Sequence, residues 1–219
     1  MVFVNLREVV DLVAAQVTLC PLPLVWSETR WAVSEYLKKT RAWRHVARGI
    51  LLTPETESYC IGTPPGTMIC SVYSVRIGSH ELNHIAGEGE VWPETGGVAR
   101  RPEFWTFRNG RIFLFPVCEA FDIPRPDGAE EWPVMDVLCS LTTEGRNPDL
   151  PEWLDRDEIS WGALGKLFTM QGQPWSNPEI GMYFDNKFTQ AIARKRIERM
   201  HGGRPGSLLI QAPLFGGYF

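Results

Sequence analysis

The sequence has few cysteines and histidines, and neither residue is arranged as a disulfide or metal site usually requires. The five cysteines stand far apart along the 219 residues, and none belongs to a Cys-x-x-Cys pair. An odd number without paired spacing argues against a disulfide framework and against a zinc site. We therefore expect a reducing compartment, in which the cysteines act as small buried apolar side chains.

The sequence also has fewer basic than acidic residues. The chain has 22 Lys and Arg residues against 26 Asp and Glu residues, a net charge of −4. Proteins that bind bare duplex DNA normally show a basic bias, so this composition counts against such a function. The glycine-rich motifs Gly-x-Gly-x-x-Gly and Gly-x-x-x-x-Gly-Lys-Ser/Thr, which cradle phosphates, are absent as well.

No apolar run approaches the roughly 18 to 20 residues that cross a bilayer. The opening stretch MVFVNLREVV lacks the basic and apolar regions of a signal peptide. We therefore expect a soluble protein that is made in the cytosol and has no membrane partner.

Helical patterns occupy the first forty residues. Asn5 stands where it can cap a helix, with Glu8 in capping-box position. A second helix is predicted from Ser27, because CPLPLV interrupts the pattern. The apolar stripe of the first helix consists of Leu6, Val9, Val10, Val13 and Val17.

A second pair of helices is predicted near the end of the chain. One starts with Pro151 in its first turn, and its Gly162 and Gly165 indicate close packing against a neighbour. Asn177 caps the other, with Pro178 at the first helical position, and the pattern continues to about Met200. The apolar stripe of this last helix consists of Ile180, Phe184, Phe188, Ala191 and Ile192.

Residues 41–145 have the pattern of β structure, with short Val-, Ile- and aromatic-rich runs between Pro and Gly residues. The strongest signal is EFWTFRNGRIFLFP, where Asn109-Gly110 favours a type I′ hairpin turn. Long loops are expected at about 87–103 and 119–133. The predicted fold class is α+β: a helical domain of residues 1–40 and 146–203, an inserted antiparallel sheet or small barrel at 41–145, and an extended arm at 204–219.

Catalytic patterns are weak. His80 and His84 flank Glu81 but lack the His-Glu-x-x-His order of a zinc protease, and they lie in a β-rich stretch. Cys118 could pair with a histidine as a nucleophile, yet no family signature surrounds it. We assign no catalytic residue, metal or cofactor.

Two features at the C-terminal end are typical of interfaces. The last helix ends in a basic collar, which either complements the helix dipole or faces an acidic partner or DNA; it consists of Arg194, Lys195, Arg196, Arg199 and Arg204. After Arg204 the chain has no charge, whereas disordered tails are usually polar. The apolar side chains of this tail are Leu208, Leu209, Ile210, Leu214, Phe215, Tyr218 and Phe219.

The order of these features resembles the head–tail adaptor proteins of tailed bacteriophages, the group related to tail tubular protein A. Four stretches carry the resemblance, and together they cover most of the chain. They are the N-terminal helix with WSETRWAVSEYLKKT and the strand after it, the aromatic hairpin RPEFWTFRNGRIFLFP, the closing helix pair LPEWLDRDEISWGALGKLFTMQGQPWSNPEIGMYFDNKF, and the basic helix end. The loops near 87–103 and 119–133 match no part of the pattern.

This resemblance implies a non-enzymatic virion protein at the head–tail interface, present in the host cytoplasm before assembly. Its expected partners are the portal protein, copies of itself in a ring of twelve, a downstream tail or nozzle protein, and packaged DNA that passes without sequence-specific binding. The tail 204–219 is then a docking arm for the portal or an adjacent subunit. The alternatives are a small hydrolase that uses Cys118 with a histidine, and a DNA-binding accessory factor that uses the basic helix end.

Overall fold

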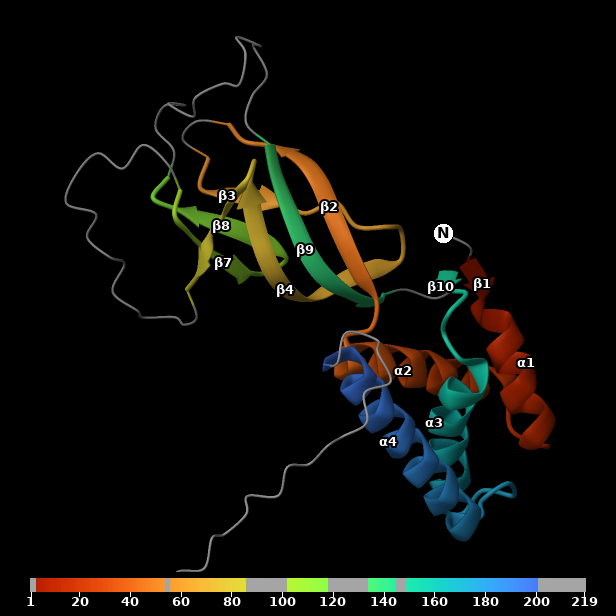
Figure 1. The fold of residues 1–219 in the computed structure, drawn as a ribbon. Helices are drawn as coiled ribbons and strands as arrows, with labels where there is room; N and C mark the ends of the chain where they lie inside the picture. The colour runs from red at the N-terminus through yellow and green to blue at the C-terminus, as the bar shows by residue number, and fades with distance from the viewer. Residues whose placement is uncertain (1–2, 54–55, 86–101, 118–133, 145–148, 201–219) are drawn as a thin grey trace, which may run out of the picture.

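The computed structural model describes residues 3–53, 56–85, 102–117, 134–144 and 149–200. Within these ranges the chain combines four helices with mostly antiparallel sheets, so the predicted α+β class is confirmed. Figure 1 shows the helices gathered in one part of the molecule and the two larger sheets in another. The tail 204–219 and most of the predicted loops 87–103 and 119–133 lie outside the described residues.

The predicted bundle of terminal helix pairs is present. Its members are α1 (Leu6–Gln16), α2 (Leu22–Thr40), α3 (Arg156–Thr169) and α4 (Pro178–Met200). Two predicted caps are confirmed. Asn5 Oδ1 accepts a hydrogen bond from the Arg7 amide at 2.8 Å, and Asn177 Oδ1 accepts one from the Ile180 amide at 3.3 Å. Both helices thus start where the cap residues indicate.

Helix α2 corrects the predicted start at Ser27. It begins at Leu22, so Pro23 lies inside its first turn, where the missing N–H has no intrahelical partner to lose. Glu8, expected in a capping box, forms an ion pair with Arg156 instead (2.5 Å), which joins the starts of α1 and α3.

Helix α3 corrects the predicted role of Pro151. That residue ends the short strand β10 (Asp149–Pro151), which pairs antiparallel with β1 (Phe3–Asn5). The helix begins only at Arg156, and Asp155 caps it by accepting hydrogen bonds from the amides of Asp157 (2.9 Å) and Glu158 (3.3 Å). The small β1–β10 sheet therefore ties the two predicted helical segments of the chain together.

Helices α3 and α4 approach each other closely, as the two glycines predict. A Cβ added to Gly162 would lie 2.8 Å from the Phe188 ring, and one added to Gly165 would lie 3.0 Å from the backbone nitrogen of Asp185. On the opposite helix, a Cβ on Gly181 would lie 2.6 Å from Thr169. The absence of side chains at these positions is what allows the two helices to pack at this distance.

The predicted apolar stripe of α4 is right for its second half and wrong for its start. Phe188, Ala191 and Ile192 are buried, and Phe184 is half-buried, but Ile180 is 41% exposed. The reason is the contact of Gly181 with Thr169 on α3. With this contact the buried residues of α4 are Gly181, Phe188, Ala191 and Ile192, and Ile180 lies to one side of the face that they form.

The β region forms two four-stranded sheets, and within the described residues neither closes into a barrel. The first has the order β2 (Arg44–Leu51), β9 (Val134–Thr143), β4 (Thr67–Ile77), β5 (His80–Glu81) and is antiparallel throughout. The second has the order β3 (Ser58–Cys60), β8 (Arg111–Phe115), β7 (Phe104–Arg108), β6 (Asn83–His84), with β6 and β7 parallel.

The predicted aromatic hairpin is β7–β8. Asn109 and Gly110 both have positive φ, 49° and 77°, as a type I′ turn requires. Trp105 and Ile112 of the hairpin are buried, and the Trp105 indole N–H donates to the Leu82 carbonyl (3.2 Å). The polar end of this large side chain is thereby satisfied inside the core.

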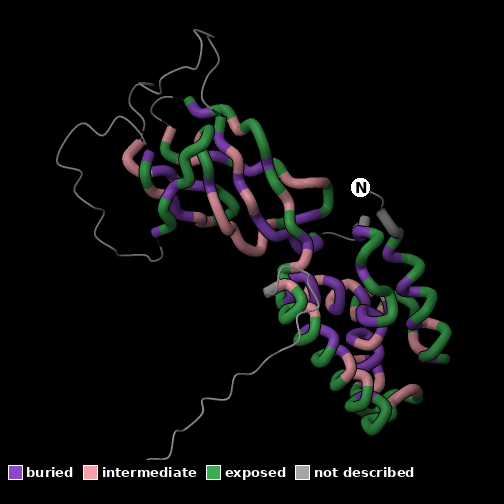
Figure 2. Tube along the Cα trace, viewed as in Figure 1, coloured by how far each residue is buried: buried purple, intermediate pink, exposed green. Residues whose placement is uncertain are grey.

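The helical bundle and the first sheet meet where α2 passes into β2. Thr142 of β9 is buried and its hydroxyl donates to the Ser34 carbonyl of α2 (3.2 Å). Trp43, between α2 and β2, is 2% exposed, and its carbonyl accepts from the Leu141 amide (2.8 Å). Buried residues run through the bundle and the sheets in Figure 2, and most of the buried apolar ones belong to one hydrophobic core cluster.

Candidate functional site

The basic residues in the last turns of α4 lie in two places. Arg194 reaches α3, where its guanidinium bonds Glu158, and Lys195 bonds Glu198 on its own helix (3.1 Å). Arg196 and Arg199 lie instead at the junction with the first sheet. Arg204, the remaining member of the predicted basic collar, lies outside the described residues. The structure thus divides the collar into an inward part and a junction part.

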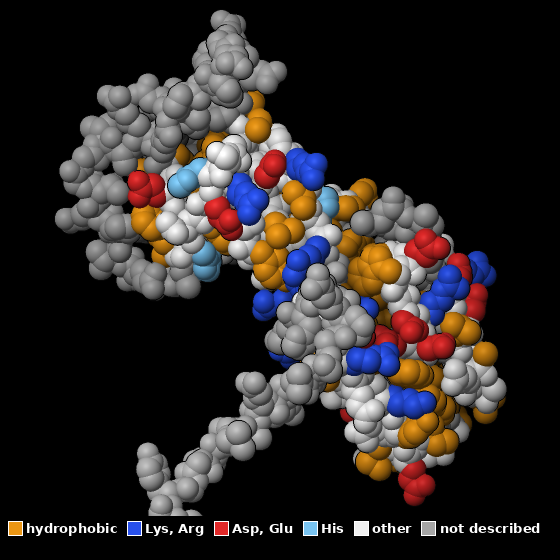
Figure 3. All heavy atoms as spheres, in the orientation of Figure 1, with side chains coloured by type: hydrophobic (Ala, Val, Ile, Leu, Met, Phe, Trp, Pro, Cys, Tyr) orange, Lys and Arg blue, Asp and Glu red, His pale blue; other side chains and the backbone are white. Residues whose placement is uncertain are grey.

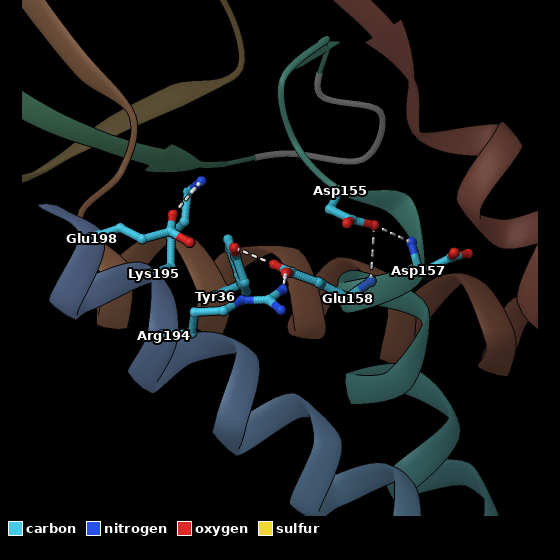
Figure 4. A network of polar contacts seen from close by, with 7 residues as sticks. All are labelled: Tyr36, Asp155, Asp157, Glu158, Arg194, Lys195 and Glu198. Carbon is cyan, nitrogen blue, oxygen red and sulfur yellow. Dashed lines mark hydrogen bonds and ion pairs between the residues drawn. The ribbon is translucent and has the colours of Figure 1, made fainter. Parts of the chain in front are cut away.

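The inward part is a polar network between three helices (Figure 4). Glu158 of α3 is 4% exposed and accepts from both Arg194 of α4 and the Tyr36 hydroxyl of α2, the latter at 2.5 Å. Burial, followed by the hydrogen bond to Glu158, raises the pKa of the Tyr36 hydroxyl well above its usual range. The hydrogen bond to the same carboxylate raises the pKa of Arg194. The network fixes the end of α4 against the bundle.

Replacing Glu158 with alanine is expected to lower the free energy of unfolding by about 1–3 kcal/mol, because the buried Tyr36 hydroxyl loses its acceptor. Replacing Arg194 with alanine is expected to cost less, about 1 kcal/mol, because the Arg194 side chain is 62% exposed and the buried Glu158 carboxylate keeps its hydrogen bond from Tyr36. Urea denaturation of both variants measures the difference. Equal losses of unfolding free energy in the two variants would show that the Arg194–Glu158 ion pair, and not the Tyr36–Glu158 hydrogen bond, provides the stability.

The junction part is a basic pocket of about 470 Å³. It is formed by the last turn of α2 and the turn after it, by the first residue of β2, by β4, and by the last turns of α4. The lining residues are Lys38, Lys39, Thr40, Arg41, Arg44, Tyr73, Arg196 and Arg199. In Figure 3, Lys and Arg side chains gather where the helical bundle meets the β region.

Tyr73 organises two of the guanidinium groups. Arg199 donates to the Tyr73 hydroxyl and to the Thr40 carbonyl, both at 2.8 Å. The guanidinium carbons of Arg199 and Arg44 lie 5.2 Å and 5.6 Å from the centre of the Tyr73 ring. These distances fall within the range of cation–π attraction, so both cations are held in place.

The sequence indicates a basic collar that includes Arg196 and Arg199, but it does not indicate their partners. The dipole of α2 alone is enough to explain Lys38 and Lys39, although LKKTRAWR places four cations between residues 38 and 44. That run is the signal that could have revealed the pocket. Tyr73 gives no such signal, because only the fold brings β4 beside the ends of α2 and α4.

The candidate nucleophiles and ligands do not come together in the described residues. Burial raises the pKa of Cys20 and Cys70, and it raises that of Cys139 to about 11, which disfavours the thiolate. His80 and His84 lie in β5 and β6, and the His84 ring lies 4.4 Å from that of Trp105. Cys118, the nucleophile of the hydrolase alternative, is outside the described residues.

The part of the chain that the structure describes contains no group of three or more His, Cys, Asp or Glu residues suited to holding a metal ion. In the same ranges, no helix has both the length and the apolar character needed to cross a membrane. The docking residues predicted in the tail, 208–219, fall outside these ranges.

No protein-family model matches the sequence, and no curated protein matches it in a sequence comparison. The function of the chain is therefore inferred from its own sequence and from the chemistry of the described residues.

Proposed function

We propose that this protein is a structural virion protein, a head–tail adaptor of a tailed bacteriophage. Twelve copies form a ring beneath the portal, extend the DNA channel and provide the platform for the next tail or nozzle protein. The chain is present in the host cytoplasm before assembly and at the head–tail interface of the virion afterwards. The ordered resemblance of four stretches of the sequence to such adaptors supports this proposal.

One structural observation carries the proposal further: α4 has two different exposed surfaces at its two ends. At its start, Ile180, Met182 and Tyr183 are 41%, 59% and 54% exposed. At its end, Arg196 and Arg199 line the basic pocket. Met182 and Arg199 are about 25 Å apart along the helix at 1.5 Å per residue. Subunits in a closed ring meet through two different surfaces, so a rigid helix with two such ends suits a ring subunit.

The apolar end of α4 is of the kind that assembly buries. Large exposed apolar side chains that lie close together on a folded chain are typical of interaction sites. Trp175, in the turn before α4, belongs to the same end, and its indole nitrogen is buried without a hydrogen-bond partner among the described residues. Orange side chains are prominent at this end of the bundle in Figure 3.

Assembly is expected to depend on the portal. The free protein should be a monomer in light scattering, because ring closure and docking of the arm are each too weak alone, and addition of the portal protein encoded with it should give a complex of about twelve copies on the portal. The double variant Met182→Ser with Tyr183→Ser should weaken this complex, because it removes exposed apolar area that assembly would bury. Failure to associate with that portal at any salt concentration would contradict the proposal.

A further inference from the structure

The basic pocket contains more positive charge than its surroundings require. Six of its lining residues are Lys or Arg, and Lys39 is neutralised by an ion pair with Glu35 (2.8 Å). The ends of α2 and α4 each contribute about half a negative charge. Within the described residues, about four of the six positive charges therefore remain once Glu35 and the two helix ends are subtracted.

This excess stands out against the rest of the chain. Of the 22 basic residues, six line the pocket, which leaves 16 against 26 acidic residues elsewhere. The residues outside the pocket therefore carry a net negative charge, whereas the pocket lining is positive. A negatively charged ligand would be attracted to this pocket.

The pocket is also arranged before any ligand arrives. Arg199 is fixed by two hydrogen bonds and by the Tyr73 ring, which also holds Arg44. Each guanidinium has further N–H donors, and such donors match the oxygens of phosphate in pairs. Lys38, Arg41 and Arg196 are exposed, and among the described residues no hydrogen bond or ion pair engages their side-chain charges. These three cations are therefore available to a ligand.

We infer that the basic pocket binds phosphate groups of a nucleic-acid strand. A single carboxylate would leave most of the excess charge uncompensated, whereas successive phosphates of one strand bring one charge each. The lining is polar and charged, with Tyr73 already engaged by two cations, so an apolar ligand finds no complementary surface. The contacts reach phosphate and not base edges, so binding is independent of sequence.

The choice of DNA as the source of these phosphates rests on the proposed function, in which packaged DNA passes through the adaptor. The phosphate chemistry itself rests only on the pocket. The two ideas are therefore tested with different material: the pocket with the free protein and DNA, and the adaptor with the portal. If the free protein does not bind DNA, the adaptor proposal still stands, and if it does not associate with the portal, the phosphate site still stands.

The test measures fluorescence anisotropy of a labelled short duplex DNA with the free protein. Binding is expected to be weak, with a Kd of about 10⁻⁴ to 10⁻⁶ M, and to fall steeply between about 50 and 200 mM salt. The variant Lys38→Gln with Arg196→Gln removes two exposed cations whose charges no described residue engages by a hydrogen bond or ion pair. It is expected to bind at least about tenfold more weakly and to reduce the slope of log K against log salt by about two.

The control is Arg7→Gln with Arg48→Gln, which makes the same change in net charge on exposed positions of α1 and β2 outside the pocket. Its affinity should match that of the unaltered protein. Inorganic phosphate and polyglutamate are titrated as competitors. Equal affinity of the pocket variant and the control, tighter binding of polyglutamate than of DNA, or binding of inorganic phosphate without binding of DNA would each overturn the inference.

Discussion

Replacing Phe188 with alanine is expected to lower the free energy of unfolding by about 3–5 kcal/mol. The ring is 3% exposed, and it lies 6.3 Å from Trp31 and 6.2 Å from Tyr36, centre to centre, so it joins α4 to α2. It also covers Gly162 of α3, where no side chain could fill the space that the ring leaves. The result is a cavity between three helices, and a cavity that cannot collapse gives losses at the upper end of this range.

Urea denaturation measures this loss, and Ile180→Ala is the matched control on the same helix. Ile180 is 41% exposed, so its truncation should change stability by less than about 0.5 kcal/mol. Both residues belong to the stripe predicted from the sequence, and only the structure separates them. An unchanged melting temperature for Phe188→Ala, or a larger loss for Ile180→Ala, would show that the buried face of α4 is misassigned.

Deletion of residues 206–219 is expected to abolish or strongly weaken attachment to the portal while the fold stays intact. Among the described residues, the buried hydrophobic core runs from Leu6 to Ile192, so the bundle and both sheets have their cores without the tail. The tail itself has no charge after Arg204 and many apolar side chains. Capsids assembled with the shortened protein should package DNA and then leak it.

Two measurements on the same deletion separate the docking arm from its alternative. In that alternative the tail folds back on its own β region as an edge strand. A large loss of thermal stability with portal binding retained would favour the fold-back strand. A full-length variant with Leu214, Phe215, Tyr218 and Phe219 changed to serine controls for tail length, and it should lose portal binding as the deletion does.

Local signals in the sequence predicted local structure well. Asn109-Gly110 specified the turn of the β7–β8 hairpin, because a type I′ turn requires positive φ at both positions and Asn and Gly adopt it readily. Asn177 and Pro178 specified the start of α4, because the Asn177 side chain caps the helix and proline is favoured at its first position. Gly162 and Gly165 predicted the close approach of α3 and α4, because glycine inside a helix is otherwise unfavourable.

The features that the sequence did not predict depend on contacts between distant parts of the chain. Strands β1 and β10 have three residues each, so neither has a recognisable pattern of its own, and α1, α2 and both larger sheets lie between them in the sequence. Periodicity predicts that Ile180 belongs to the core, because it gives a helix face but not its rotation, which the contact of Gly181 with Thr169 sets. The basic pocket combines residues 38–44, 73 and 196–199, and only the fold brings these segments together.

The proposed function depends above all on many copies of this chain forming a ring between the portal and the tail. The decisive measurement is the mass of the connector isolated from purified virions, together with the stoichiometry of its proteins. We expect this chain to be present in about twelve copies for each portal ring, bound to the portal. Absence of the chain from purified virions, or its presence in one or a few copies away from the portal, would contradict the proposed function.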